Sequence, residues 1–263
     1  YWAWNGNRLK YVYATLWRPF LMNLEYENGI EVAGFEIADH VLARIGWLLP
    51  LLTVALSMLI HALSGNARTL PFFISEADHP GLERWIFTTG LTISGGVLCI
   101  IAYRFRCLFL SSDKTKQTRI SFYSGITTGV AIIVLGFVNM YDALLWHCVV
   151  AFFVFVGGLI WGTSTHLLVG STETSGKKLR RIGLGMAVFG LVAMNLILIF
   201  FIGSNQDELS NGDTLLQRLD TIQSAINYAA MAEYILFLGL IITLAAFEPD
   251  LKTKNLSKDE LVS

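Results

Sequence analysis

Residues 144–168, LLWHCVVAFFVFVGGLIWGTSTHLL, contain no lysine, arginine, aspartate or glutamate. As a helix, this stretch is long enough to cross the hydrocarbon core of a bilayer, which takes about 20 apolar residues. Five more apolar runs lie near 45–63, 85–110, 120–140, 182–203 and 222–247. None shows the alternation of a barrel strand, and in lipid only helices or closed barrels satisfy the backbone. The sequence therefore predicts an all-α, polytopic membrane protein, a bundle of six transmembrane helices.

The composition of the whole chain agrees with this prediction. Of 263 residues, 54 % are hydrophobic and 15 % charged, whereas a soluble domain carries about 25 % charged residues. The net charge of −1 argues against nucleic-acid binding, which uses a basic face. The three cysteines lie in or beside apolar runs, so we expect no disulfide framework.

Lysine and arginine predict the orientation of the bundle. They gather in the second-to-third and fourth-to-fifth connections, whereas residues 204–221 are acidic with Arg218 as their only cation. Short basic connections stay in the cytosol, so both termini should be cytosolic and residues 64–84, 141–144 and 204–221 lumenal or extracellular. Basic side chains beside a membrane attract anionic lipids. The expected cytosolic lipid contacts are Arg104, Arg106, Lys114, Lys116, Lys177, Lys178, Arg180 and Arg181.

Two terminal segments flank the predicted transmembrane domain of residues 44–248. Residues 1–43 begin with aromatic and basic side chains interleaved, a mixture typical of the membrane interface. We interpret them as an interfacial cytosolic arm or, alternatively, as an arm that binds another membrane protein. The acidic end of this arm is expected to be a short surface loop or helix. Residues 249–263 are a predicted cytosolic tail.

The segment 71–87, PFFISEADHPGLERWIF, is the first predicted lumenal loop. Pro80 and Glu83 are expected in the first turn of the second helix, where a missing N–H and a negative charge are favourable. No second histidine is spaced suitably from His79 for a zinc site, so we predict no metal and no cofactor.

Polar residues deep in the helices are costly in lipid and therefore informative. Glu233 should face the bundle interior, paired with His147, Asn195 or Arg84. Three interpretations stay open: a buried hydrogen-bond network, a cavity for a headgroup or ion, and a catalytic site. The residues assigned to this polar cavity and its loop are Ser75, Glu76, His79, Glu83, Arg84, His147, Asn195 and Glu233.

Several short motifs in residues 45–250 resemble the DRAM/FRAG/SFK family of six-helix membrane proteins, and its DRAM branch most. The first loop matches through Pro71, Phe72, Phe73, Ile74, Ser75, Glu76, Pro80, Glu83 and Phe87. A histidine-led fourth helix (His147, Val149, Gly157) and the segment AAMAEY with Glu233 match as well. The resemblance implies a non-enzymatic lipid-sensing or scaffolding protein in autophagy, in endolysosomal membranes or in the plasma membrane.

Two other functions remain open. In a FRAG-like factor that remodels GPI lipids, His147 and Glu233 would be acid–base candidates. In an accessory subunit of a larger membrane complex, residues 1–43 would be the tether.

Overall fold

The computed structural model describes residues 22–24, 29–110, 114–169, 175–204 and 214–252. Within them lie six helices long and apolar enough to cross a membrane, which confirms the predicted all-α bundle. They are α2 (Asp39–Leu63), α3 (Leu82–Leu108), α4 (Thr115–Leu135), α5 (Met140–Val169), α6 (Ser175–Ser204) and α9 (Gln223–Ala245). The first helix begins at Asp39 rather than near 45, so Pro50 lies in its interior and not in its first turns.

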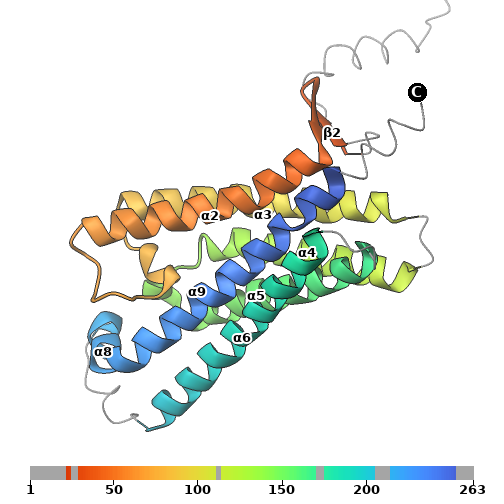
Figure 1. Cartoon of the computed structure of the whole chain (residues 1–263). Helices are drawn as coiled ribbons and strands as arrows, with labels where there is room; N and C mark the ends of the chain where they lie inside the picture. The colour runs from red at the N-terminus through yellow and green to blue at the C-terminus, as the bar shows by residue number, and fades with distance from the viewer. Residues whose placement is uncertain (1–21, 25–28, 111–113, 170–174, 205–213, 253–263) are drawn as a thin grey trace, which may run out of the picture.

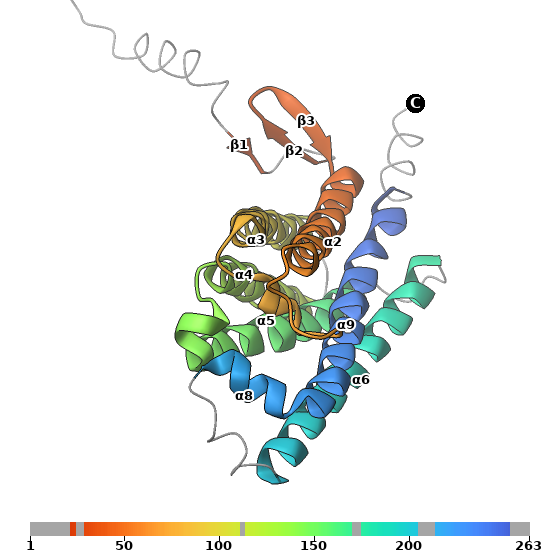
Figure 2. The same cartoon turned by 90° about the vertical axis from the view of Figure 1, so that its left-hand side faces the viewer.

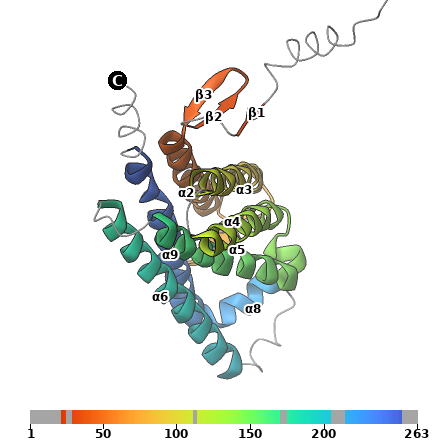
Figure 3. The same ribbon diagram turned by 90° about the vertical axis from the view of Figure 1, so that its right-hand side faces the viewer.

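The helices pack in chain order around most of the bundle. α2, α3, α4 and α5 lie side by side, α6 pairs closely with α9, and α9 returns to pack against α2 (Figure 1). In the view turned by 90°, α6 lies at the edge of the bundle, outside α9 (Figure 2). The short helix α8 (Leu215–Thr221) runs from the start of α9 towards α5 (Figure 3). α5 packs much less closely against α6 and α9 than against α4, which leaves space between them.

Glycines allow the close approach of α3 and α4. A side chain at Gly129 would place its Cβ 2.5 Å from Cys99 Sγ and 2.7 Å from the carbonyl oxygen of Gly95. Small residues at such contacts let helix backbones meet where lipid provides no hydrophobic driving force. The pairing of α3 with α4 therefore depends on these positions staying glycine.

A small antiparallel sheet precedes the first transmembrane helix. Its strands are β1 (Met22–Asn23), β2 (Gly29–Val32) and β3 (Phe35–Ala38), in the order β1-β2-β3. The expectation of a loop or helix here is therefore wrong. Ala33 and Gly34 both have positive φ (53° and 83°), as in the tight hairpin turns that match strand twist. The aromatic residues 1–21 and the tail from 253 onwards lie outside the described residues.

The two ends of the bundle differ in what they carry. One end, called here the sheet end, holds β1–β3 and the end of α9 (Figure 1). The other, the loop end, holds residues 64–81, the 3₁₀ helix η2 (Ile74–Ala77) and α8.

Candidate functional site

The loop of residues 64–81 is held to the bundle by a buried arginine. Arg68 donates two hydrogen bonds to the carboxylate of Glu76, from Nε at 2.8 Å and from Nη2 at 2.7 Å. Its Nη1 also bonds Asp220 on α8 (3.1 Å) and Gln223 on α9 (2.5 Å). Glu76 is fully buried and accepts a further bond from the N–H of Phe73 at 2.9 Å. One guanidinium thus connects the loop to two helices.

Glu233 on α9 accepts a hydrogen bond from the backbone of this loop. The N–H of Ile74 donates to Glu233 Oε2 at 2.7 Å, and the hydroxyl of the neighbouring Tyr234 donates to the carbonyl oxygen of Phe72. Ile74 is the first residue of η2, where a helix leaves its N–H groups without an internal partner. The buried carboxylate of Glu233 accepts a hydrogen bond from one of these N–H groups, that of Ile74.

The predicted side-chain partners of Glu233 are bonded elsewhere, so that expectation is wrong. Arg84 donates to the carbonyl oxygen of Asp78 at 3.2 and 3.3 Å. His147 Nδ1 lies 2.7 Å from the carbonyl oxygen of Val138, and Asn195 donates to that of Leu191 at 2.8 Å. The carbonyl groups of Asp78 and Val138 lie outside the helices, and Asn195 bonds the carbonyl four residues earlier on its own helix.

A cavity of about 530 Å³ lies beneath the loop, between α5 on one side and α6, α8 and α9 on the other. Its lining is mostly apolar, with Phe152, Phe155, Leu191, Met194 and Leu198 among the larger side chains. The polar groups in the lining are Ser75, His147, Cys148, Asn195, Arg218 and Glu233. Of the eight residues predicted for a polar cavity and its loop, Ser75, His147, Asn195 and Glu233 line this mostly apolar cavity.

The cavity opens sideways between α5 and α6. Lining residues on both helices have exposed side chains. They include Phe152 (58 %) and Leu144 (43 %) on α5, and Asn195 on α6. Because these helices are long and apolar enough to cross a membrane, the opening would face the region that lipid occupies. Arg218 is the lining residue that the sequence could have indicated, as the only cation of its acidic connection.

The other four predicted residues are not among those that line this cavity. Glu76 pairs with Arg68, and Arg84 lies beside Asp78. His79, in the loop, lies beside Glu83 in the first turn of α3. Burial raises the pKa of Asp78 to about 7, and the nearby Arg84 offsets part of that rise. Pro80 does not belong to the helix as predicted, because Gly81 is the N-cap and α3 begins at Leu82.

The structure also brings His61 to His79 and Glu83, which the sequence analysis missed. The Nδ1 atoms of His61 and His79 lie 3.5 and 3.7 Å from Glu83 Oε1. The spacing argument for a zinc site therefore did not detect His61, whose ring centroid lies 5.5 Å from that of His79. Spacing along the chain gives no sign of this contact, because the loop folds back on the end of α2.

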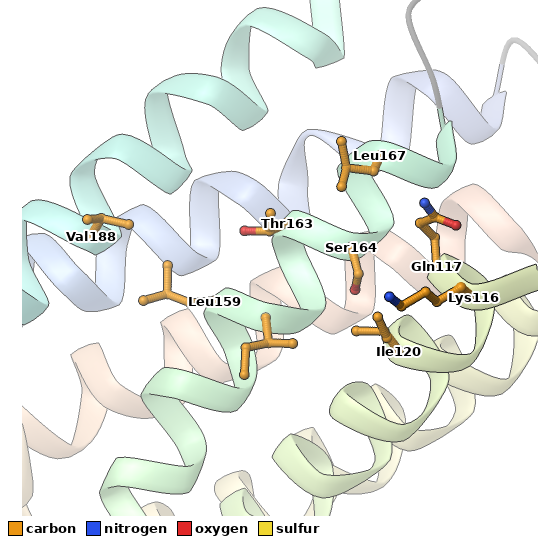
Figure 4. Close-up of a pocket in the computed structure, with 9 residues that line it drawn as sticks. Lys116, Gln117, Ile120, Leu159, Thr163, Ser164, Leu167 and Val188 are labelled. Atoms are coloured by element: carbon orange, nitrogen blue, oxygen red, sulfur yellow. The ribbon is translucent and has the colours of Figure 1, made fainter. Parts of the chain in front are cut away.

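A second groove, of about 490 Å³, lies near the sheet end between α4, α5 and α6. Figure 4 shows Lys116 on α4 close to Ser164 on α5, with Thr163 turned towards the side of Val188. Val188 of α6 contributes to its other wall. Lys116, one of the predicted lipid contacts, thus lies in a surface groove.

Two predicted lipid contacts are instead buried ion pairs. Arg104 donates to both carboxylate oxygens of Asp39 (2.8 and 2.9 Å) and to the carbonyl oxygen of Leu24. Arg180 is fully buried and pairs with Asp250. Neither guanidinium reaches the surface, so both hold the sheet end together and do not contact lipid. Lys177 is half-buried, and the exposed members of the set are Arg106, Lys114, Lys116, Lys178 and Arg181.

Comparison with known families identifies the class of this bundle. The Frag1/DRAM/Sfk1/Cwh43P N-terminal domain matches residues 40–254, which include all six long helices from their first or second residue onwards. No curated protein and no solved structure matches the chain. Because the match covers most of the chain, the protein belongs to the Frag1/DRAM/Sfk1/Cwh43 family of membrane proteins.

Proposed function

We propose that the chain is a non-enzymatic protein of DRAM type that binds a phospholipid in the cavity between α5 and α6. Through this lipid it would act as a sensor or scaffold in an endolysosomal membrane or the plasma membrane. The observation that carries the proposal is the cavity itself: it is sizeable, apolar for most of its lining and open towards the membrane.

The distribution of side chains in the cavity suits an amphipathic ligand. Pockets that bind small molecules have volumes of about 300–1,000 Å³, apolar walls and a few placed polar groups. The apolar walls from α5 and α6, including Phe152, Phe155 and Leu198, would take an acyl chain. Ser75 and Arg218 come from the loop and α8, so the headgroup would lie at the loop end.

The charge pattern supports an orientation for this site. Exposed basic residues cluster at the sheet end, which by the positive-inside rule would face the cytosol, with both termini on that side. The loop end would then be lumenal or extracellular, and the bound lipid would come from that leaflet. At the sheet end, Arg106, Lys114, Lys116, Lys177 and Lys178, together with Arg181, would contact anionic lipids.

A cavity-filling substitution tests lipid binding. Ala151 lines the cavity, so Ala151→Trp should occupy part of its volume. Val130 on α4 is 49 % exposed at the bundle surface, and Val130→Trp serves as the matched control. Native mass spectrometry of protein released from nanodiscs should show one retained phospholipid for the wild type and the control. Equal retention by Ala151→Trp would contradict the proposed site.

A FRAG-like activity on GPI lipids is the second candidate, because His147 and Glu233 line the same cavity. A carbonyl oxygen only accepts, so His147 Nδ1 carries the proton in its bond to Val138. In the neutral form of the ring, Nε2 would then carry no proton and could act as a base. Turnover of a GPI lipid by the purified protein, lost in His147→Gln, would favour this activity over simple binding.

An accessory subunit remains the third proposal, with residues 1–43 as the tether to a larger assembly. Its test is co-purification at fixed stoichiometry after mild extraction. A monodisperse monomer that retains lipid would count against it.

A further inference from the structure

Three metal-binding side chains converge at the loop end from three separate elements. His61 lies in the last turn of α2, His79 in the loop and Glu83 in the first turn of α3. One donor atom from each residue lies within 4.8 Å of the other two. The carboxylate oxygen Glu83 Oε1 is 3.5 Å from His61 Nδ1 and 3.7 Å from His79 Nδ1.

These distances are close to those between ligands of one zinc ion. Zinc binds histidine nitrogen and carboxylate oxygen at about 2.0–2.2 Å in tetrahedral geometry, which places two ligand atoms about 3.3 Å apart. The two measured distances exceed that value by only a few tenths of an ångström. The donor atoms of all three residues lie within 4.8 Å of one another, so the cluster would contract on binding an ion.

The same distances are poor for direct hydrogen bonds. An N–H···O bond has its most common length at about 2.9–3.0 Å, and both contacts are longer. His79 Nδ1 is buried and has no hydrogen-bond partner among the described residues. Leaving a buried polar atom unpaired is unfavourable. A bound cation would satisfy this nitrogen and the facing carboxylate together.

The surroundings hold the two rings while leaving access to the site. His61 packs edge-on against Phe72 with ring centroids 5.2 Å apart, and His79 against Tyr141 at 5.4 Å. The side chains of His61 and Glu83 are 1 % and 3 % exposed, but that of His79 is 24 % exposed. An ion can therefore reach the cluster past His79.

The carboxylate of Glu83 also packs closely against Gly81. A Cβ on Gly81 would lie 2.5 Å from Glu83 Oε2 and 3.0 Å from Glu83 Cδ. A side chain at position 81 would therefore force the carboxylate of Glu83 to shift, and the φ of 158° at Gly81 would strain the backbone as well. This gives a way to disturb the cluster without replacing one of its three members.

We propose that His61, His79 and Glu83 form a Zn²⁺ site at the loop end of the bundle. Two imidazoles and one carboxylate suit zinc or a similar divalent transition metal, whereas Ca²⁺ and Mg²⁺ prefer oxygen ligands alone. Three protein ligands leave a fourth position for water or an anionic group. The ion would tie the loop that covers the lipid cavity to the ends of α2 and α3 (Figure 1). The site stands whether or not the cavity binds lipid.

Zinc titration of the tag-free, full-length protein in detergent tests the site. After removal of metal with a chelator, Zn²⁺ is titrated in competition with a chromogenic chelator, and Co²⁺ binding is followed by its visible absorption. We expect one Zn²⁺ per chain and the spectrum of four-coordinate Co²⁺ with nitrogen and oxygen ligands. Glu83→Gln and His79→Ala should each weaken Zn²⁺ binding by about 100-fold or more, and Gly81→Ala by about tenfold, as the loss of a supporting group does.

His40→Ala is the matched control, because His40 lies at the sheet end, on α2 but far along the helix from His61. It should leave Zn²⁺ affinity unchanged, and excess Mg²⁺ should not compete. Zn²⁺ affinity equal in wild type and His79→Ala, or no stoichiometric binding by the wild type, would overturn the proposal. Were the buried variants to misfold, the wild-type Co²⁺ spectrum and His79→Ala, the least buried of the three, would still decide it.

Discussion

Replacing Arg68 with alanine should release the loop of residues 64–81 from the bundle. Arg68 makes two hydrogen bonds to Glu76, and the two side chains are 5 % and 0 % exposed. Removing one partner of a buried ion pair leaves an uncompensated charge and costs about 3–5 kcal/mol. Glu76 keeps its bond to the N–H of Phe73, which favours the lower end of that range.

This cost sets the size of the expected effect. Since about 1.4 kcal/mol changes an equilibrium constant tenfold, the open population of the loop should rise by roughly two orders of magnitude at the lower end of the range. Hydrogen–deuterium exchange of the detergent-solubilised protein measures this population through the backbone amides of residues 64–81. Their exchange should accelerate while amides in α3 and α4 stay protected.

Arg44→Ala is the matched control. Arg44 also pairs with a glutamate, Glu248, but its side chain is 52 % exposed and the pair lies at the sheet end. Exposed pairs contribute little to stability, so the loop amides should be unaffected. Arg68→Met combined with Glu76→Leu should restore part of the protection, because a buried pair can often be replaced by apolar side chains. Identical loop exchange in Arg68→Ala and Arg44→Ala would refute the reasoning.

Three further sets of substitutions test other contacts through unfolding in a denaturing detergent. Arg104→Met leaves Asp39 buried and unpaired, so the free energy of unfolding should fall by about 3–5 kcal/mol; a loss no larger than that of a surface substitution would contradict the pairing. Gly95→Ala forces a methyl group against α4 and should cost about 1–3 kcal/mol, whereas Gly96→Ala meets open space and should stabilise α3 by about 0.5–1 kcal/mol; equal effects would argue against close α3–α4 packing. Glu233→Gln keeps an acceptor for the loop N–H and should be milder than Glu233→Ala, which should cost about 1–3 kcal/mol; the reverse order would exclude this hydrogen bond as a main role.

The bundle was predictable because lipid imposes a simple rule on sequence. A membrane-spanning backbone must satisfy its own hydrogen bonds, so runs of apolar residues indicate spanning helices. The same logic placed Glu233 inside the bundle, where it lies 7 % exposed. Its partner could not be predicted, since the donor is a backbone N–H of a loop that folds inwards. Hydropathy contains no information about that fold-back.

Counting lysine and arginine along the sequence identified where basic residues cluster but did not show which of them form buried ion pairs. Arg104 and Arg180 add to a basic end in the sequence, yet each is buried against an aspartate distant along the chain. His61 was overlooked because a rule on ligand spacing considers neighbours in sequence, and the chain turns back through the loop before reaching His79. The β2–β3 hairpin was missed because its strands have only four residues each. Short elements depend on turn geometry more than on pattern.

A structure determined in nanodiscs of defined lipid composition is the most direct test of the central claim. Lipid binding in the cavity predicts elongated non-protein density between α5 and α6, beneath the loop, with its polar end beside Ser75 and Arg218 and its tail along Phe152. The claim would be contradicted by α5 closed against α6 with the cavity filled by side chains. An empty cavity in a map that resolves ordered lipids elsewhere around the bundle would contradict it equally.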